Sequence, residues 1–127
     1  MRRLIYCLLI CSVAVSVNAA NWLELDNNIY IDADSVSIFN KNTQVVTAFF
    51  KDVNMSSLKL TSKNKIVDSM RSKTAFNCKD ETGFVLSLIE YDSKNTPINS
   101  FSRPIYGPFD VVHPETVIDL KMKAACI

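Results

Sequence analysis

The N-terminal 19 residues have the pattern of a removable export signal. Arg2 and Arg3 carry positive charge, residues 4–17 are almost entirely apolar, and Val17-Asn18-Ala19 fits the small-residue rule for signal peptidase. The apolar run is too short and too weakly flanked to predict a membrane-spanning helix. We therefore expect cleavage after Ala19, which leaves residues 20–127 as a single domain that folds outside the cytoplasm.

A lipoprotein signal is the alternative for this segment. Residues 8–11, with the sequence Leu-Leu-Ile-Cys, loosely resemble a lipobox, but the branched Ile10 stands where a small residue is usual. No later stretch approaches the length of apolar sequence that a spanning helix needs, so no transmembrane segment is expected. The predicted location is the periplasm or the cell surface.

The charge balance of the mature chain is close to neutral. Loss of Arg2 and Arg3 leaves 12 basic and 13 acidic residues, a formal net charge of −1. This composition has no long block of one charge and predicts neither nucleic-acid binding nor an acidic membrane partner. The densest basic stretch, residues 59–73, predicts a solvated edge strand, with a local patch for an anionic partner as the alternative. Its cations are Lys59, Lys63, Lys65, Arg71 and Lys73.

Two of the four cysteines remain in the mature chain. Cys7 and Cys11 leave with the signal, so Cys78 and Cys126 are the pair that meets an oxidising compartment. An even pair in a small exported domain predicts a structural disulfide. Closing a loop of this size stabilises the fold by about 4 kcal/mol in the chain-entropy model.

Strand-like composition dominates the first part of the mature chain. Residues 22–25 and 29–32 flank an Asp-Asn-Asn turn and predict a first hairpin. Residues 45–50 are β-branched and aromatic on both faces, which is typical of a central, well-buried strand. Residues 65–78 alternate only in part and predict either a long edge strand or two shorter strands.

The second part of the chain ends in a helix. Residues 84–91 predict another strand, whereas prolines and a glycine in residues 103–109 argue against regular central pairing. His113-Pro114 is expected to open the helix, because proline suits a first turn. The helix is too short to be stable alone and must bury an apolar stripe. Its apolar positions are Val117, Ile118, Leu120, Met122, Ala124 and Ala125.

These elements predict an α+β fold. It is an antiparallel sheet of about five to six strands, with the C-terminal helix packed on it. Because Cys126 lies at the end of the helix, the disulfide would tie the helix to the strand that carries Cys78.

No residue pattern predicts catalysis, a cofactor or a metal. His113 is the only histidine, stands beside a proline and has no second ligand nearby. Asp32 and Asp34 flank a single alanine and are expected to cap backbone N–H groups. A small periplasmic enzyme that uses these two carboxylates is the alternative. With only two glycines in the chain, no phosphate-cradling loop is expected.

Three aromatic residues form the candidate partner contact. Phe101, Tyr106 and Phe109 lie in or beside the proline-containing segment, outside the strong strand patterns. Exposed loop aromatics drive protein recognition, because they bury a large area at low entropic cost. Packing in the core, or as a lid over it, is the alternative for these rings.

Several landmarks together resemble the surface-adhesin protein E family of small exported bacterial proteins. They are Trp22 in a short strand, Tyr30-Ile31-Asp32 followed by Asp34-Ser35-Val36, Cys78 at the end of a strand, Tyr91, a Pro114 helix and the final Cys126. The resemblance implies an antiparallel sheet with a C-terminal helix tied back by a disulfide. It also implies adhesion to host matrix proteins, although no short motif here carries that activity.

The expected function is recognition by an exported, non-enzymatic domain. A protein partner in the cell envelope or on a host is expected, and a homodimer is an alternative. Besides the small periplasmic enzyme, the other function left open is a structural accessory subunit of an envelope complex.

Overall fold

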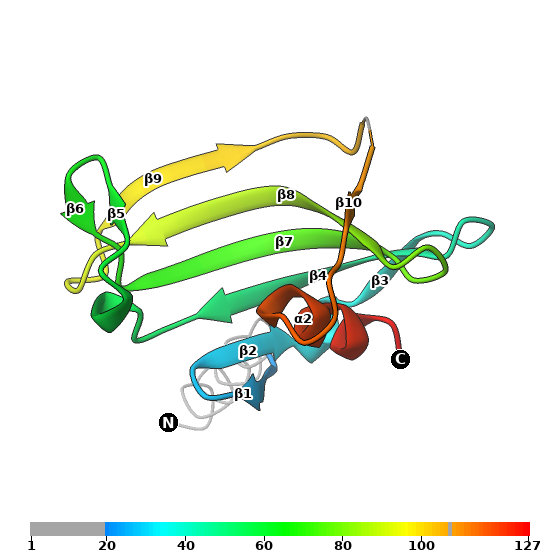
Figure 1. Ribbon diagram of the computed structural model, residues 1–127, viewed down its shortest axis with the longest axis horizontal. Helices are drawn as coiled ribbons and strands as arrows, with labels where there is room; N and C mark the ends of the chain where they lie inside the picture. Colours follow the sequence, from blue (N-terminus) through cyan, green and yellow to red (C-terminus); the bar gives the residue numbers. More distant parts are fainter. Residues whose placement is uncertain (1–19, 107) are drawn as a thin grey trace, which may run out of the picture.

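The computed structural model describes residues 20–106 and 108–127. The predicted signal and its cleavage site, residues 1–19, lie outside this part of the chain. Eight strands form one antiparallel sheet, in which six follow the order β1-β2-β4-β7-β8-β10, while β3 pairs with β4 and β9 pairs with β8 (Figure 1). The strands are β1 (Trp22–Asp26), β2 (Ile29–Asp32), β3 (Ser37–Asn40), β4 (Val45–Asp52), β7 (Ser69–Asn77), β8 (Thr82–Tyr91), β9 (Pro97–Ser102) and β10 (Asp110–Val111).

The remaining elements are short apart from one helix. A two-stranded hairpin lies at the end of the sheet away from the chain's C-terminus (Figure 1). The elements are the 3-10 turns η2 (Ala33–Ser35) and η3 (Ser56–Leu58), the hairpin strands β5 (Thr61–Ser62) and β6 (Lys65–Ile66), and the helix α2 (Val117–Ala125). The predicted α+β fold is therefore confirmed, as are the first hairpin and the strand at residues 84–91.

The centre of the sheet is β4, as its two-sided apolarity predicts. Its first half pairs with β3, its second half pairs with β2, and its whole length pairs with β7 on the other side. The prediction of an edge strand within residues 59–73 was wrong. β7 lies in the interior of the sheet and pairs with both β4 and β8, while Lys59, Lys63 and Lys65 belong to the β5–β6 hairpin and its approach.

One face of the sheet, here called the helix face, is covered by α2. Its buried residues Ile31, Ala48, Phe50 and Phe76 form one apolar cluster with Met122 and Ala125 of the helix. Figure 1 is drawn from this side, with α2 in front of β2 and β4. A Cβ at Gly83 would lie 3.1 Å from the ring of Phe76, its partner across the strands, so a larger residue there would have to displace the ring by a few tenths of an ångström.

The helix begins three residues later than Pro114. Thr116 is the N-cap, and its Oγ1 accepts a hydrogen bond from the Asp119 backbone N–H at 3.2 Å. The Asp119 carboxylate in turn accepts from the backbone N–H of Glu115 at 3.1 Å, which completes a reciprocal cap. Glu115 has a positive φ of 64°, so the chain turns between Pro114 and the helix. Of the expected apolar positions, Met122 and Ala125 are buried, whereas Val117 is exposed.

Two links besides apolar packing hold the helix to the sheet. Cys78 and Cys126 form the predicted disulfide, with Cα atoms 5.7 Å apart. Lys121 Nζ lies 2.7 Å from Asp52 Oδ1 of β4, and the two side chains are only 9% and 13% exposed. This ion pair was not predicted, because the sequence places Lys121 simply near the helix C-terminus, where a cation is favourable anyway.

The opposite face of the sheet, here called the open face, is covered only at one end. There, Val45, Ala75, Phe84 and Leu86 form a second buried cluster, on which Ile105 and Phe109 pack. Ile105 and Phe109 thus cover this end of the open face, as α2 covers the helix face. The rest of the open face carries Tyr30, Phe49, Lys51, Arg71, Lys73, Ile89 and Tyr91.

Candidate functional site

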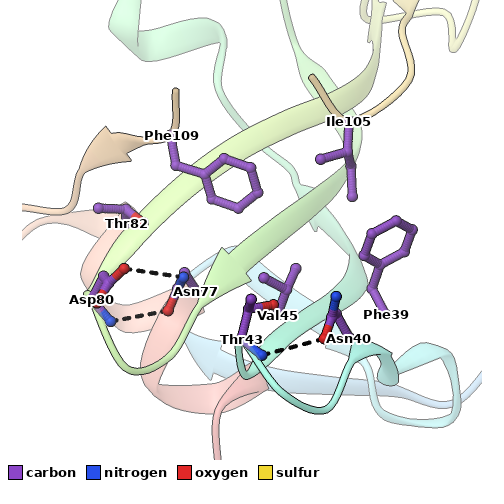
Figure 2. Close-up of a pocket in the computed structure, with 9 residues that line it drawn as sticks. All are labelled: Phe39, Asn40, Thr43, Val45, Asn77, Asp80, Thr82, Ile105 and Phe109. Carbon is purple, nitrogen blue, oxygen red and sulfur yellow. Dashed lines mark hydrogen bonds between the residues drawn. The ribbon is translucent and has the colours of Figure 1, made fainter. Parts of the chain in front are cut away.

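A hollow of about 430 Å³ lies at the covered end of the open face (Figure 2). Figure 2 shows Ile105 and Phe39 together on one side of it, Phe109 on the other, and Val45 in the lower part of the view. Its polar side chains are occupied by turns: the Asn77 amide donates to Asp80 Oδ2 at 3.3 Å, and Asn40 Oδ1 accepts from the backbone N–H of Thr43. The hollow therefore offers mainly apolar contact area.

Phe84 holds the neighbouring aromatic side chains together. Phe109 stacks on it with ring centroids 5.4 Å apart, and Tyr106 meets it edge-on at 6.0 Å. The guanidinium of Arg103 lies 4.1 Å from the Phe84 centroid and 5.7 Å from that of Phe101. Such ring–ring and cation–ring contacts are favourable beyond the area they bury. We call Phe84, Phe101, Arg103, Tyr106 and Phe109 the Phe84 group.

The backbone beside the Phe84 group is fixed by hydrogen bonds. The Arg103 N–H donates to the carbonyl oxygen of Leu86 at 2.8 Å, and Arg103 Nε donates to the carbonyl oxygen of Val85 at 2.9 Å. These bonds continue the pairing of β8 past the end of β9. The backbone at Arg103, two residues after Phe101, is therefore held against β8.

The three predicted contact residues differ in exposure. Tyr106 is 62% exposed and Phe101 is 42% exposed, whereas Phe109 is partly buried in the second cluster. Phe101 lies in the regular strand β9, so its placement outside the strands was wrong. The structure brings Tyr106 and Phe109 together on Phe84 and joins Phe101 to them through Arg103.

Two further hollows continue along the open face. One of about 610 Å³ shares Phe39 and Ile105 with the first and extends to Lys73 and Ser87. The next, of about 260 Å³, also reaches Ser87 and is lined mainly by apolar atoms. Its side chains include Trp22, Phe49, Arg71, Ile89 and Tyr91. Recognition along this face could thus involve much more of the sheet than the Phe84 group.

Sequence reasoning missed the contribution of β1, β2 and β4 to this face. Trp22, Tyr30 and Lys51 converge there, with Lys51 Nζ lying 4.7 Å from the centroid of Trp22 and 4.9 Å from that of Tyr30. The period-two alternation of Phe49 and Lys51 with buried residues was the available signal. Glu24 accepts a hydrogen bond from the Tyr30 hydroxyl at 3.3 Å, and its negative charge raises the pKa of Tyr30 above the ordinary value.

Asp32 binds backbone N–H groups, whereas Asp34 and His113 take no part in these aromatic contacts. Asp32 caps η2 and accepts from the backbone N–H groups of Asn21 and Asp34, at 3.1 and 3.2 Å. This confirms the capping role predicted for Asp32, whereas Asp34 is exposed in the first turn of η2. His113 is exposed, and its carbonyl oxygen accepts from the Thr116 hydroxyl.

Within residues 20–106 and 108–127, no group of three or more His, Cys, Asp or Glu side chains is arranged to hold a metal ion. Over the same part of the chain, no helix has the length and apolarity needed to cross a membrane.

Comparisons with known proteins place the chain in a family. No curated protein sequence matches it. Two crystal structures of Haemophilus influenzae protein E share its fold: one is 17% identical with a TM-score of 0.55, covering 85% of each chain. The second crystal form is 16% identical with a TM-score of 0.56, covering 85% of this chain and 88% of that one. The family model for surface-adhesin protein E matches residues 21–127, and the chain therefore belongs to the surface-adhesin protein E family.

Proposed function

We propose that this protein is an exported, non-enzymatic, adhesin-like domain that binds a protein partner in the cell envelope or on a host. Membership of a surface-adhesin family supports export to the surface and a binding role. The proposal includes removal of residues 1–19 as a signal, so that the working protein begins at Ala20.

The observation that carries the proposal is the exposure of the Tyr106 ring, which lies edge-on against Phe84. Its ring is 62% exposed although it contacts Phe84, and Phe101 is also exposed. Aromatic side chains that are already held in place lose little freedom on binding, so more of their buried area becomes affinity. The apolar hollow below Phe109 and Ile105 extends the contact area that a partner can fill.

Capture from envelope and host-matrix extracts tests this assignment. The mature protein, with its N-terminus verified as Ala20 by intact mass, is immobilised and compared with Tyr106→Ala. Loss of a central aromatic anchor costs about 2 kcal/mol or more, so we expect the affinity for the captured partner to fall about 30-fold. The melting temperature should change little, because most of the Tyr106 side chain is exposed.

Leu58→Ala is the matched control, because Leu58 is 64% exposed but lies at the opposite end of the sheet in η3. Phe109→Ala is less suitable as a test, since Phe109 packs in the second cluster and its loss would lower stability as well. Equal affinity of the wild-type protein and Tyr106→Ala for the partner would remove the Phe84 group from the binding surface. A turnover abolished by changing Asp32 or Asp34 would place the protein among enzymes instead.

A further inference from the structure

Two like charges face each other near the middle of the open face. Tyr30, Lys51, Arg71 and Ile89 are successive register partners across β2, β4, β7 and β8. The neighbouring row places Phe49 opposite Lys73, which in turn faces Ser87. Lys51, Arg71 and Lys73 therefore project from two adjacent strands onto one face. Like charges directly opposite in a sheet are destabilising, so the pairing of Lys51 with Arg71 is itself unfavourable for the fold.

None of these three cations forms an ion pair with a carboxylate within the described residues. The two ion pairs found there are Lys121 with Asp52 and Lys123 with Asp119, and both belong to the helix. Two acids, Glu24 and Asp32, lie on the same side of the sheet and offset part of this charge, so three cations against two carboxylates leave a small net positive charge. Glu24 accepts from the Tyr30 hydroxyl, and Asp32 accepts from two backbone N–H groups. The open face thus keeps a positive charge that an anionic ligand would complement.

Each cation rests on the face of an aromatic ring. Lys51 lies over Trp22 and Tyr30, Lys73 Nζ lies 5.3 Å from the Phe49 centroid, and the Arg71 guanidinium lies 6.0 Å from that of Tyr91. These contacts hold the charges in position and occupy ring faces. Single-stranded nucleic acids need open ring faces on which bases stack, so this arrangement disfavours them. Ammonium and guanidinium groups keep further N–H donors for carboxylates.

An apolar hollow lies between the charges. The space of about 260 Å³ is bordered by Trp22, Phe49, Ile89 and Tyr91, with Arg71 and the carboxylate of Asp32 also lining it. Such a space suits one apolar side chain, which a peptide can supply and a sulfated glycan lacks. Carboxylates on either side of that side chain would then reach Lys51, Arg71 and Lys73.

We infer that the open face binds an acidic segment of a partner protein, in which one apolar side chain fills the hollow and flanking carboxylates meet Lys51, Arg71 and Lys73. This inference rests on the proposed binding function and names the chemistry of the partner. It assigns recognition to the uncovered end of the sheet, whereas the Phe84 group lies at the covered end.

A synthetic peptide tests the inference directly. The probe is a ten-residue peptide with one phenylalanine flanked on both sides by glutamates and aspartates, and its control carries the matching amides. We expect the oxidised protein to bind the acidic peptide, more weakly as salt increases, and not the amide peptide. Lys51→Gln and Arg71→Gln should each weaken binding about tenfold, since each removes a charge-assisted hydrogen bond. Lys65→Gln, which makes the same charge change on the β5–β6 hairpin, should leave the affinity unchanged.

A stability measurement guards against damage to the fold. Lys51→Gln relieves the repulsion from Arg71 but also removes the contacts with Trp22 and Tyr30, so the melting temperature should change little while peptide binding weakens. No binding of the acidic peptide, an equal effect of Lys65→Gln, or tighter binding of heparin or oligothymidine would overturn the inference. If the peptide fails while Tyr106→Ala still loses its captured partner, only this inference falls and the proposed function stands.

Discussion

The helix face buries Ile31, Ala48 and Phe50 beneath α2, whereas on the open face the same strands leave Phe49 42% exposed and Lys51 without a carboxylate partner. The charged side chains on the two faces have different kinds of partner. On the helix face, Asp52 is paired with Lys121 and closed off from water. On the open face, Lys51 and Lys73 lie over aromatic rings, and Lys51 lies opposite Arg71. The packing on the helix face thus stabilises the domain, whereas the uncovered part of the open face is accessible for contact.

Removal of the disulfide, which secures the helix face, should cause the largest loss of stability. The double change Cys78→Ser with Cys126→Ser is expected to lower the free energy of unfolding by about 4 kcal/mol, because the bridge closes a loop across a sequence separation of 48 residues. Hydrogen exchange by mass spectrometry should show that the amides of α2 lose protection first. If β7 and β8 lose protection before α2 does, the helix face is not the part that the bridge secures.

The ion pair between helix and sheet should have the next largest effect. Lys121→Met leaves the Asp52 carboxylate nearly buried and unpaired, and we expect a loss of about 3 kcal/mol in chemical denaturation. Lys123→Met is the matched control on the same helix: Lys123 is 70% exposed, so solvent screens its pair with Asp119 and the loss should be much smaller. If Lys121→Met and Lys123→Met lower the free energy of unfolding equally, the difference in burial between the two ion pairs does not affect their contribution to stability.

The smallest effect concerns acid stability at the start of α2. The hydrogen bond from Lys123, aided by the backbone N–H of Glu115, holds the pKa of Asp119 below its ordinary value. A lowered folded-state pKa gives stability that is present above the ordinary pKa of about 3.9 and is lost as the pH falls through the folded value. The melting temperatures of the wild-type protein and Asp119→Asn should therefore converge as the pH falls below about 4.

Lys123→Met helps to interpret that convergence, since it removes the ion pair but keeps the Asp119 cap on Glu115. A difference between the wild-type protein and Asp119→Asn that stays constant from neutral to acid pH would show that the carboxylate charge is unimportant there. Both outcomes concern only the helix face, so neither bears on the binding that we propose for the open face.

Local patterns were enough to predict much of the framework. The Asp-Asn-Asn turn and its flanking apolar residues predicted the first hairpin, and the β-branched run at 45–50 predicted the central strand. Helix bounds were predicted less well, because Thr116 and Asp119 form a cap that competes with the proline signal at Pro114. Residues 69–77 were misjudged because their alternation is interrupted by serines and lysines, although pairing on both sides buries Thr74, Ala75 and Phe76.

The sequence by itself determined that Cys78 and Cys126 would pair, that a terminal helix would need a sheet to cover, and that no metal or catalytic cluster was indicated. These conclusions rest on residue counts and local periodicity. Only the tertiary structure decided that Lys51, Arg71 and Lys73 share one face with Trp22 and Tyr91, and that Tyr106 and Phe109 meet on Phe84. The physical reason is register: a shift of one residue between β4 and β7 would send every side chain to the other face, and register is set by long-range pairing.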